Sequence, residues 1–162
     1  MNISDVLQPD DVILGLQVEG KTRLLKEMAR HAAARTGASA AEITTALASR
    51  EKLGSTGLGQ GIAIPHAKLS GLQRPFGAFV RLVTPCPFEA IDDQDVDIVV
   101  LLLLPEAAPR EYLNLLSRIA RTLREPGLVA RLRQENDAAI VYRRLLAAER
   151  TPSAACRGFS GS

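Results

Sequence analysis

The sequence predicts an α/β domain in which a mixed β-sheet carries helices on both faces. Helical and strand patterns alternate along the chain instead of separating into blocks. Residues 96–104 form a near-continuous run of Val, Ile and Leu, which is typical of a central strand buried on both faces. The 162 residues suffice for one domain. We expect this domain to span residues 1–150, followed by a flexible C-terminal tail, 151–162.

The N-terminal third is expected to hold one strand and two helices. Residues 11–18 have strand composition, although their alternation is imperfect. Residues 21–35 place apolar side chains at helical spacing, and Gly37 supplies a stop signal. The stretch Ser39-Ala-Ala-Glu42 then predicts a capping box that opens a second helix, ending near Arg50.

The C-terminal half is expected to add two strands and three helices. A strand over 76–83 precedes the central strand. A helix then begins at Pro109 and ends at Pro126-Gly127. A short helix over 128–132 and a last helix capped by Asn136-Asp137 follow. The apolar stripe of the first of these helices is predicted to consist of Tyr112, Leu113, Leu116, Ile119, Ala120 and Leu123.

Composition and charge exclude several classes of function. Twenty Lys and Arg against eighteen Asp and Glu leave a net charge of +2, which argues against a strongly basic nucleic-acid binder. Aromatic residues make up only 4%, so stacking platforms for bases are scarce. The longest apolar run, 98–104, is far short of the roughly 20 residues that cross a bilayer. Because the N-terminus also lacks a signal-peptide pattern, we expect a cytoplasmic protein without nucleic acid or membrane insertion.

Neither a metal nor a cofactor is expected. Two cysteines far apart and two histidines do not supply the clustered ligands of a zinc site. The acidic run 92–97 lacks the pattern of a calcium loop. Between residues 110 and 150, nine Arg against five acids give a local charge of +4. We interpret this segment as solvated helix surface, with an acidic partner or RNA as the alternative.

The most informative segment is the glycine-rich stretch between Leu53 and His66. It holds four glycines in eight residues, which excludes a regular element and predicts a shaped loop. Their spacing fits neither a P-loop nor a dinucleotide fingerprint, and no nucleophile elbow is present. Nucleotide binding and serine hydrolysis are therefore disfavoured. The four glycines are Gly54, Gly57, Gly59 and Gly61.

His66, which ends this loop, is the candidate nucleophile. An imidazole with its ordinary pKa of about 6.5 is mostly neutral at neutral pH. Pro65 restricts the adjoining backbone, and glycine N–H groups can approach an anion closely. Such a histidine suits covalent phosphoryl transfer, and Arg50 is a candidate to bind the phosphate through two hydrogen bonds, in a bidentate manner. The residues alone also allow a histidine held in the loop for structural reasons.

The stretch from Ser49 to Lys68 resembles the active-site segment of the IIA proteins of the bacterial phosphotransferase system. It reads Ser-Arg-Glu-Lys-Leu-Gly-Ser-Thr-Gly-Leu-Gly-Gln-Gly-Ile-Ala-Ile-Pro-His-Ala-Lys. The resemblance is to the fructose/mannitol/nitrogen-regulatory family, and this segment is most similar to the nitrogen-regulatory branch. It extends over about residues 3–149 and includes Pro-Phe-x-Ala-Ile-Asp-Asp-Gln-x-Val-Asp at 87–97.

The resemblance implies the mannitol/fructose IIA fold and a phosphohistidine intermediate. His66 would accept its phosphoryl group from an HPr-like phosphocarrier protein, which an enzyme I charges from phosphoenolpyruvate. Arg50 matches the family arginine near the phosphoryl group. Ser55 and Thr56 match loop positions whose hydroxyls could help hold the phosphate. Transporters or sensor kinases are the expected regulatory targets.

One position departs from the family pattern. A second histidine is common there, in a His-Leu-x-x-Leu-Ser pattern that here reads Tyr112-Leu-Asn-Leu-Leu-Ser117. A phenol can donate a hydrogen bond to a phosphate oxygen or to the His66 ring. With a pKa near 10, however, it cannot become a cation at neutral pH. Tyr112 is therefore either a residue of the site or part of the helix core.

Two other functions stay open beside that of a phosphoryl-accepting nitrogen regulator. The chain could be a sugar-specific, fructose/mannitol-type IIA subunit that passes phosphate to a permease B domain. It could also be a non-catalytic module that regulates its partners by binding alone. The presence of His66 and Arg50 favours phosphoryl acceptance, whereas Tyr112 favours the binding module. In either transfer function the protein is a phosphoryl carrier with a phosphohistidine intermediate.

Overall fold

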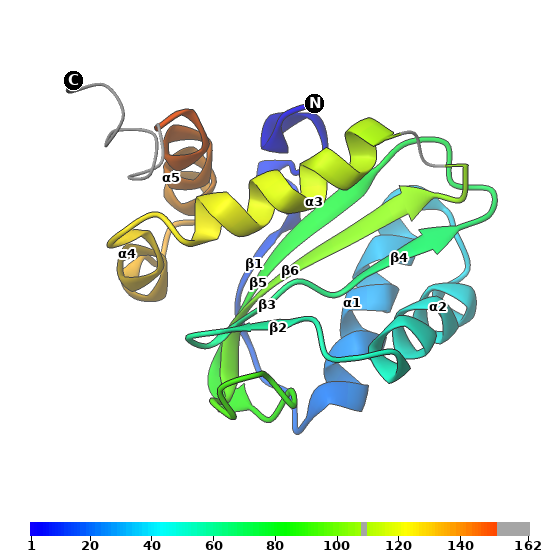
Figure 1. Cartoon of the computed structure of the whole chain (residues 1–162), viewed down its shortest axis with the longest axis horizontal. Helices are drawn as coiled ribbons and strands as arrows, with labels where there is room; N and C mark the ends of the chain where they lie inside the picture. The colour runs from blue at the N-terminus through cyan, green and yellow to red at the C-terminus, as the bar shows by residue number, and fades with distance from the viewer. Residues whose placement is uncertain (108–109, 152–162) are drawn as a thin grey trace, which may run out of the picture.

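The computed structural model describes residues 1–107 and 110–151 (Figure 1). Its strands are β1 (Val12–Leu16), β2 (Gly57–Gly59), β3 (Ile62–Ala63), β4 (His66–Leu69), β5 (Phe76–Cys86) and β6 (Val96–Pro105). Its helices are α1 (Lys21–Thr36), α2 (Ala40–Lys52), α3 (Arg110–Leu123), α4 (Leu128–Gln134) and α5 (Ala138–Arg150). Two 3-10 turns, η1 (Ile3–Asp5) and η2 (Pro9–Asp11), precede β1. None of the helices in these ranges has the length and apolar character needed to cross a membrane.

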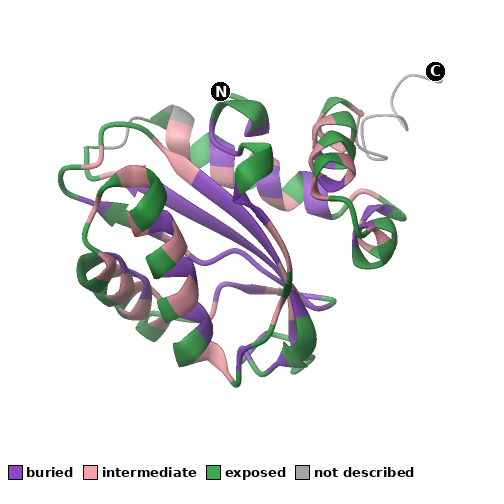
Figure 2. Cartoon of the chain, turned by 180° about the vertical axis from the view of Figure 1, so that it is seen from behind, coloured by how far each residue is buried: buried purple, intermediate pink, exposed green. Residues whose placement is uncertain are grey.

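Helices cover both faces of a mixed sheet, which confirms the predicted fold class. The six strands lie in the order β1-β5-β6-β3-β2, and β4 also pairs with β6. On one face α1 and α2 bury Leu24, Met28 and Leu47. On the other face α3 and α5 bury Leu115 and Leu145 (Figures 1 and 2).

Strand β6 lies between the two apolar cores. Val99, Leu101 and Leu103 belong to the core beneath α1 and α2. The alternate residues, including Leu102 and Leu104, belong to the core beneath α3 and α5. The prediction of a central strand buried on both faces is therefore confirmed, and Figure 2 shows the buried residues concentrated along the strands.

The same edge of β6 carries both β3 and β4. Ile62 of β3 pairs with Ile98, and further along the edge β4 pairs from His66, opposite Leu102. The segment Ile64-Pro65 interrupts this edge, although the Pro65 carbonyl still accepts a hydrogen bond from Leu102 N at 3.0 Å. His66 thereby becomes the first residue of a short strand.

Helix ends mostly follow the predicted local signals. Gly37 ends α1 with a left-handed φ of 80°, and Asp137 caps α5 by accepting from Ala139 N at 2.9 Å. Ser39 accepts from Glu42 N at 3.3 Å. Within the described ranges no return bond from the Glu42 side chain completes the predicted capping box. The predicted helix start at Pro109 and the tail beyond residue 151 lie outside the described residues.

Three expectations are wrong. The glycine-rich stretch is not without regular structure, because β2 and β3 form a short antiparallel hairpin within it. Strand β5 continues beyond residue 83 to Cys86, through an irregularity in register that accommodates Pro85, which cannot donate to the ladder. Leu113 is 53% exposed, whereas Leu115 is buried. The buried stripe of α3 therefore passes beside Leu113 and through Leu115.

Candidate active site

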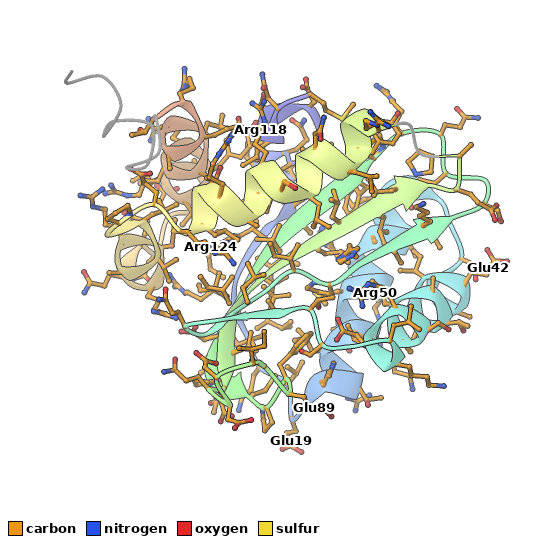
Figure 3. All side chains as sticks on the ribbon, viewed as in Figure 1. Glu19, Glu42, Arg50, Glu89, Arg118 and Arg124 are labelled. Carbon is orange, nitrogen blue, oxygen red and sulfur yellow. The ribbon has the colours of Figure 1, made fainter. Side chains whose placement is uncertain are left out.

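His66 and Arg50 meet where α2 lies beside β4. Arg50 comes from the last turn of α2, and Figure 3 shows it on the side of the molecule where that helix approaches the strand. Its Nε donates to Nε2 of His66 at 3.3 Å, and its Nη1 donates to the Gly54 carbonyl at 3.0 Å. No group of the described residues accepts from Nη2, so the guanidinium keeps a donor for a ligand.

A backbone carbonyl fixes the tautomer of His66. Nδ1 lies 2.8 Å from the carbonyl oxygen of Ile64, which can only accept, so Nδ1 carries the proton and donates it. In the neutral ring Nε2 therefore presents a lone pair. The guanidinium of Arg50, which can only donate, faces that lone pair. The two partners thus favour the same tautomer.

The environment of His66 keeps its ring neutral. Burial is the main cause that lowers its pKa below 6.5, since the charged form loses water. The hydrogen bond to Ile64 acts in the opposite direction, the positive charge of Arg50 lowers the pKa further, and the negative charge of Glu51 raises it. At neutral pH the ring is consequently in the nucleophilic form.

Ser55 and Thr56 hold the loop that follows α2. The Ser55 hydroxyl donates to the Phe88 carbonyl at 2.6 Å and accepts from Gly57 N at 3.1 Å. Thr56 is buried, and both its hydroxyl and its N–H donate to the carboxylate of Glu51. Both hydroxyls thus already have partners within the chain. Their role in holding a phosphate stays a prediction.

Analysis of the sequence missed an ion pair beneath this loop. Lys21, the first residue of α1, binds Glu51 with an Nζ–Oε2 distance of 2.7 Å, and the Glu51 side chain is only 6% exposed. The ammonium of Lys21 also lies 4.4 Å from the ring centre of Phe88. Because Glu51 directly follows Arg50, this pair anchors the end of the helix that presents Arg50. The acid next to Arg50 was the available signal, but its partner comes from a different helix.

Two glycines of the hairpin allow close packing. A Cβ atom on Gly57 would lie 2.7 Å from Cβ of Ala90. One on Gly61, whose φ is 79°, would lie 2.5 Å from Nη2 of Arg133. Arg133 donates to the Gln60 carbonyl at 2.8 Å and so ties α4 to the turn of the hairpin. These glycines therefore position the strand that leads to His66.

Tyr112 lies in the apolar stripe of α3. It is half-buried and packs against the core beneath α3 and α5. Among residues 1–107 and 110–151, no hydrogen bond joins its phenol to His66. The structure thus places Tyr112 on the helix core, and a direct role at the site stays a prediction.

The arrangement suits an electrophile that carries negative charge. A neutral imidazole with a fixed lone pair is a nucleophile, and an adjoining guanidinium can stabilise anionic oxygens. The described part of the chain holds no group of three or more His, Cys, Asp or Glu side chains that could bind a metal ion. The chemistry open to the site is attack by Nε2 of His66 on an anionic group.

Comparison with known proteins identifies the family. Residues 5–148 match the family described as "Phosphoenolpyruvate-dependent sugar phosphotransferase system, EIIA 2". The chain is 44% identical over 142 residues to the "Nitrogen regulatory protein" of Bradyrhizobium diazoefficiens. That match covers 88% of this chain and 93% of the relative.

Solved structures agree with this match. The crystal structure of nitrogen regulatory protein IIA-Ntr from Neisseria meningitidis is similar with a TM-score of 0.84 and 36% identity, over 88% of this chain and 98% of that one. Enzyme IIAMTL from Escherichia coli, solved in a complex with phosphorylated enzyme IIBMTL, has a TM-score of 0.73. At 17% identity, over 87% of this chain and 97% of that one, it shows a shared fold alone. The chain therefore belongs to the EIIA 2 family of the phosphoenolpyruvate-dependent sugar phosphotransferase system.

Proposed function

We propose that this protein is a nitrogen-regulatory IIA protein whose His66 accepts a phosphoryl group from an HPr-like phosphocarrier. The observation that carries this proposal is the pairing of the unprotonated Nε2 of His66 with the guanidinium of Arg50. Relatives named nitrogen regulatory protein support the regulatory part. We assign the function to a domain over residues 1–150 and place the protein in the cytoplasm, with the carriers that would charge it.

The transfer is a displacement at phosphorus. The Nε2 lone pair of His66 attacks the phosphoryl group of the carrier's phosphohistidine. A bond between Nε2 and phosphorus forms while the bond between phosphorus and the carrier nitrogen breaks, and that electron pair returns to the carrier's imidazole. Nδ1 of His66 keeps its proton throughout, and the Ile64 carbonyl stabilises the positive charge that the ring acquires. Arg50 donates to the phosphoryl oxygens as their negative charge shifts.

Phosphorylation would then act as a local electrostatic switch. The phosphoryl group adds close to two negative charges to a surface that presents a neutral ring and a guanidinium. A partner that binds this surface in one state is repelled or unmatched in the other. Transporters and sensor kinases are the kinds of target that this regulation would serve.

A second candidate is a sugar-specific subunit that passes its phosphoryl group to a permease B domain. Enzyme IIAMTL, which shares the fold and was solved with phosphorylated enzyme IIBMTL, favours this alternative. The two functions differ in where the phosphoryl group goes. The phosphorylated protein should keep it when mixed with a mannitol- or fructose-type B domain if it is a regulator, and lose it rapidly if it is a sugar subunit.

Intact-mass analysis tests the phosphoryl acceptance. Incubation with phosphoenolpyruvate, enzyme I and an HPr-like carrier should add one acid-labile phosphoryl group to the wild type. His66→Ala should stay unmodified, while the matched variant His31→Ala should be modified like the wild type. If the wild type stays unmodified with a charged carrier, phosphoryl acceptance is refuted and the non-catalytic binding module takes its place.

A further inference from the structure

The proposed phosphoryl group has three oxygens to be bound, more than the free donor of Arg50 can serve. It brings close to two negative charges, and the positive charges that face them are that of Arg50 and the one that the His66 ring acquires. Arg50 has also committed Nη1 to the Gly54 carbonyl. Glu51, whose charge also acts on His66, is already paired with Lys21. A second cation near His66 would supply further donors to the phosphoryl oxygens.

The pattern of β4 places Lys68 on the same face as His66. Ala67 and Leu69 are buried in the core beneath α1 and α2, so the side chains at 66 and 68 lie on the opposite face. The register agrees with this, because His66 pairs with Leu102 and Lys68 with Leu104. Both of those leucines belong to the core on the opposite face.

The spacing lets the ammonium group of Lys68 reach a group on His66. Residues two apart in a strand have Cα atoms about 6.6 Å apart, from a rise of about 3.3 Å per residue. The flexible four-carbon stem of a lysine covers a gap of that size. No rearrangement of β4 or of its pairing with β6 is needed.

Lys68 is also available, unlike the other lysines near the site. It is exposed, and within residues 1–107 and 110–151 it has no hydrogen-bond or ion-pair partner. Lys21, in contrast, is bound to Glu51. Lys52 follows Arg50 by two positions on α2, and side chains two apart on a helix do not face each other.

We propose that Lys68 binds the phosphoryl group on Nε2 of His66, as a second cation beside Arg50. This inference rests on the proposed function and assigns a further phosphate-binding residue to the same site. The phosphoryl oxygens lie between a guanidinium from α2 and an ammonium from β4. Lys68 then stabilises the phosphorylated state without being needed to form the nucleophile.

The test measures the phosphorylated state itself. Wild type, Lys68→Gln and Lys68→Arg are phosphorylated with phosphoramidate, a small donor that needs no protein docking, and in parallel with the carrier. The matched control is Lys26→Gln, which removes an exposed lysine from α1, on the other face of the sheet. The lifetime of the phosphohistidine and the pKa of its phosphoryl group, followed by phosphorus NMR, are the readouts.

Lys68→Gln should shorten the lifetime about two- to fivefold, the size expected for one exposed ion pair. It should also raise the pKa of the phosphoryl group, because a nearby cation favours the dianion. Lys68→Arg and Lys26→Gln should behave like the wild type. Equal lifetimes and equal phosphoryl pKa values in Lys68→Gln and wild type would overturn this inference alone. A wild type that neither donor modifies would overturn the proposed function as well.

Discussion

The surroundings of the two histidines differ in the charge of the partner at Nε2. On α1, Nε2 of His31 lies 2.9 Å from the carboxylate of Asp11. On β4, Nε2 of His66 lies 3.3 Å from the guanidinium of Arg50. A carboxylate accepts and a guanidinium donates, so Nε2 of His31 gives a proton to its bond whereas Nε2 of His66 offers a lone pair. Both rings are half-buried, so the difference between them lies in the partner at Nε2 and not in their exposure.

The charged side chains around the two rings also differ in how far they are paired with one another. Asp11 is 1% exposed and also accepts from Nε of Arg35 at 2.9 Å, so that the charges near His31 compensate one another. Among the described residues, the carboxylate whose charge acts on His66 is that of Glu51, which is already paired with Lys21. The polar groups around His31 are therefore paired with one another, whereas near His66 the positive charge of Arg50 can still bind an anion.

Replacing Arg50 should give the largest effect and remove what distinguishes His66. Arg50→Gln should slow phosphorylation by the carrier about 100-fold, the cost of losing one preorganised donor to a developing anionic charge. Rapid-quench measurement of phosphorylation would check this. Arg35→Gln, which changes the guanidinium near the other histidine, is the matched control and should keep the wild-type rate. A rate for Arg50→Gln within a few-fold of wild type would contradict the role given to Arg50.

Replacing His31 should affect stability instead. His31→Ala leaves buried Asp11 with Arg35 as its remaining described partner, and should lower the free energy of unfolding by about 1–3 kcal/mol. Urea denaturation would measure it. His66→Ala should cost less, because no buried carboxylate loses a partner. Equal losses in the two variants would mean that the two regions do not differ as described.

The lowered pKa of His66 predicts how its phosphorylation and the stability of the protein depend on pH. In the unfolded chain a histidine titrates near 6.5, and burial lowers the folded pKa of His66 below that value. The midpoint at which phosphorylation by phosphoramidate declines with falling pH should therefore lie below 6.5. Between the two pKa values the unfolded state binds more protons, so the stability contribution present above 6.5 is lost as the pH falls through the folded pKa. His66→Gln should remove this part of the pH dependence, whereas an unchanged slope would contradict the lowered pKa.

Replacing Tyr112 should give the smallest effect. Tyr112→Phe should change the lifetime of the phosphohistidine by less than about twofold, because no hydrogen bond joins the phenol to His66 within the described ranges. The measurement is the decay of the phosphorylated protein at neutral pH, with Tyr142→Phe on α5 as the control. A change of about fivefold or more, the size of one net hydrogen bond, would instead place the phenol at the phosphoryl group.

Much of the fold could be predicted because long elements carry strong patterns. The run ending at Leu104 and the stop at Gly37 are local signals that tertiary structure does not override. Strand β4 was missed because four residues, His-Ala-Lys-Leu, carry too little alternation to distinguish a strand from a loop. The hairpin was missed because its glycines argue against any strand, whereas the pairing of β3 with β6 and the contact of Arg133 that hold it come from distant parts of the sequence.

The sequence predicted the two main residues of the site but not the contacts that hold them in place. His66 and Arg50 stand in one contiguous motif, and the structure brings them together as the motif suggests. The pair between Lys21 and Glu51 joins two helices, and no local pattern indicates such a contact. Likewise, the donor status of His66 Nδ1 depends on a carbonyl exposed by the interruption at Pro65, which is a property of the backbone path.

Because a backbone carbonyl, that of Ile64, orients the His66 ring, this orientation does not depend on any side chain. An amide oxygen does not ionise at any pH that a cell meets, and no side-chain substitution deletes it. The His31 ring, held by a carboxylate, loses its anchor if that carboxylate is protonated or mutated. The His66 ring is instead oriented by the polypeptide path itself. Side chains around this histidine can therefore change without changing the orientation of its ring, provided that the backbone keeps the interruption between β3 and β4.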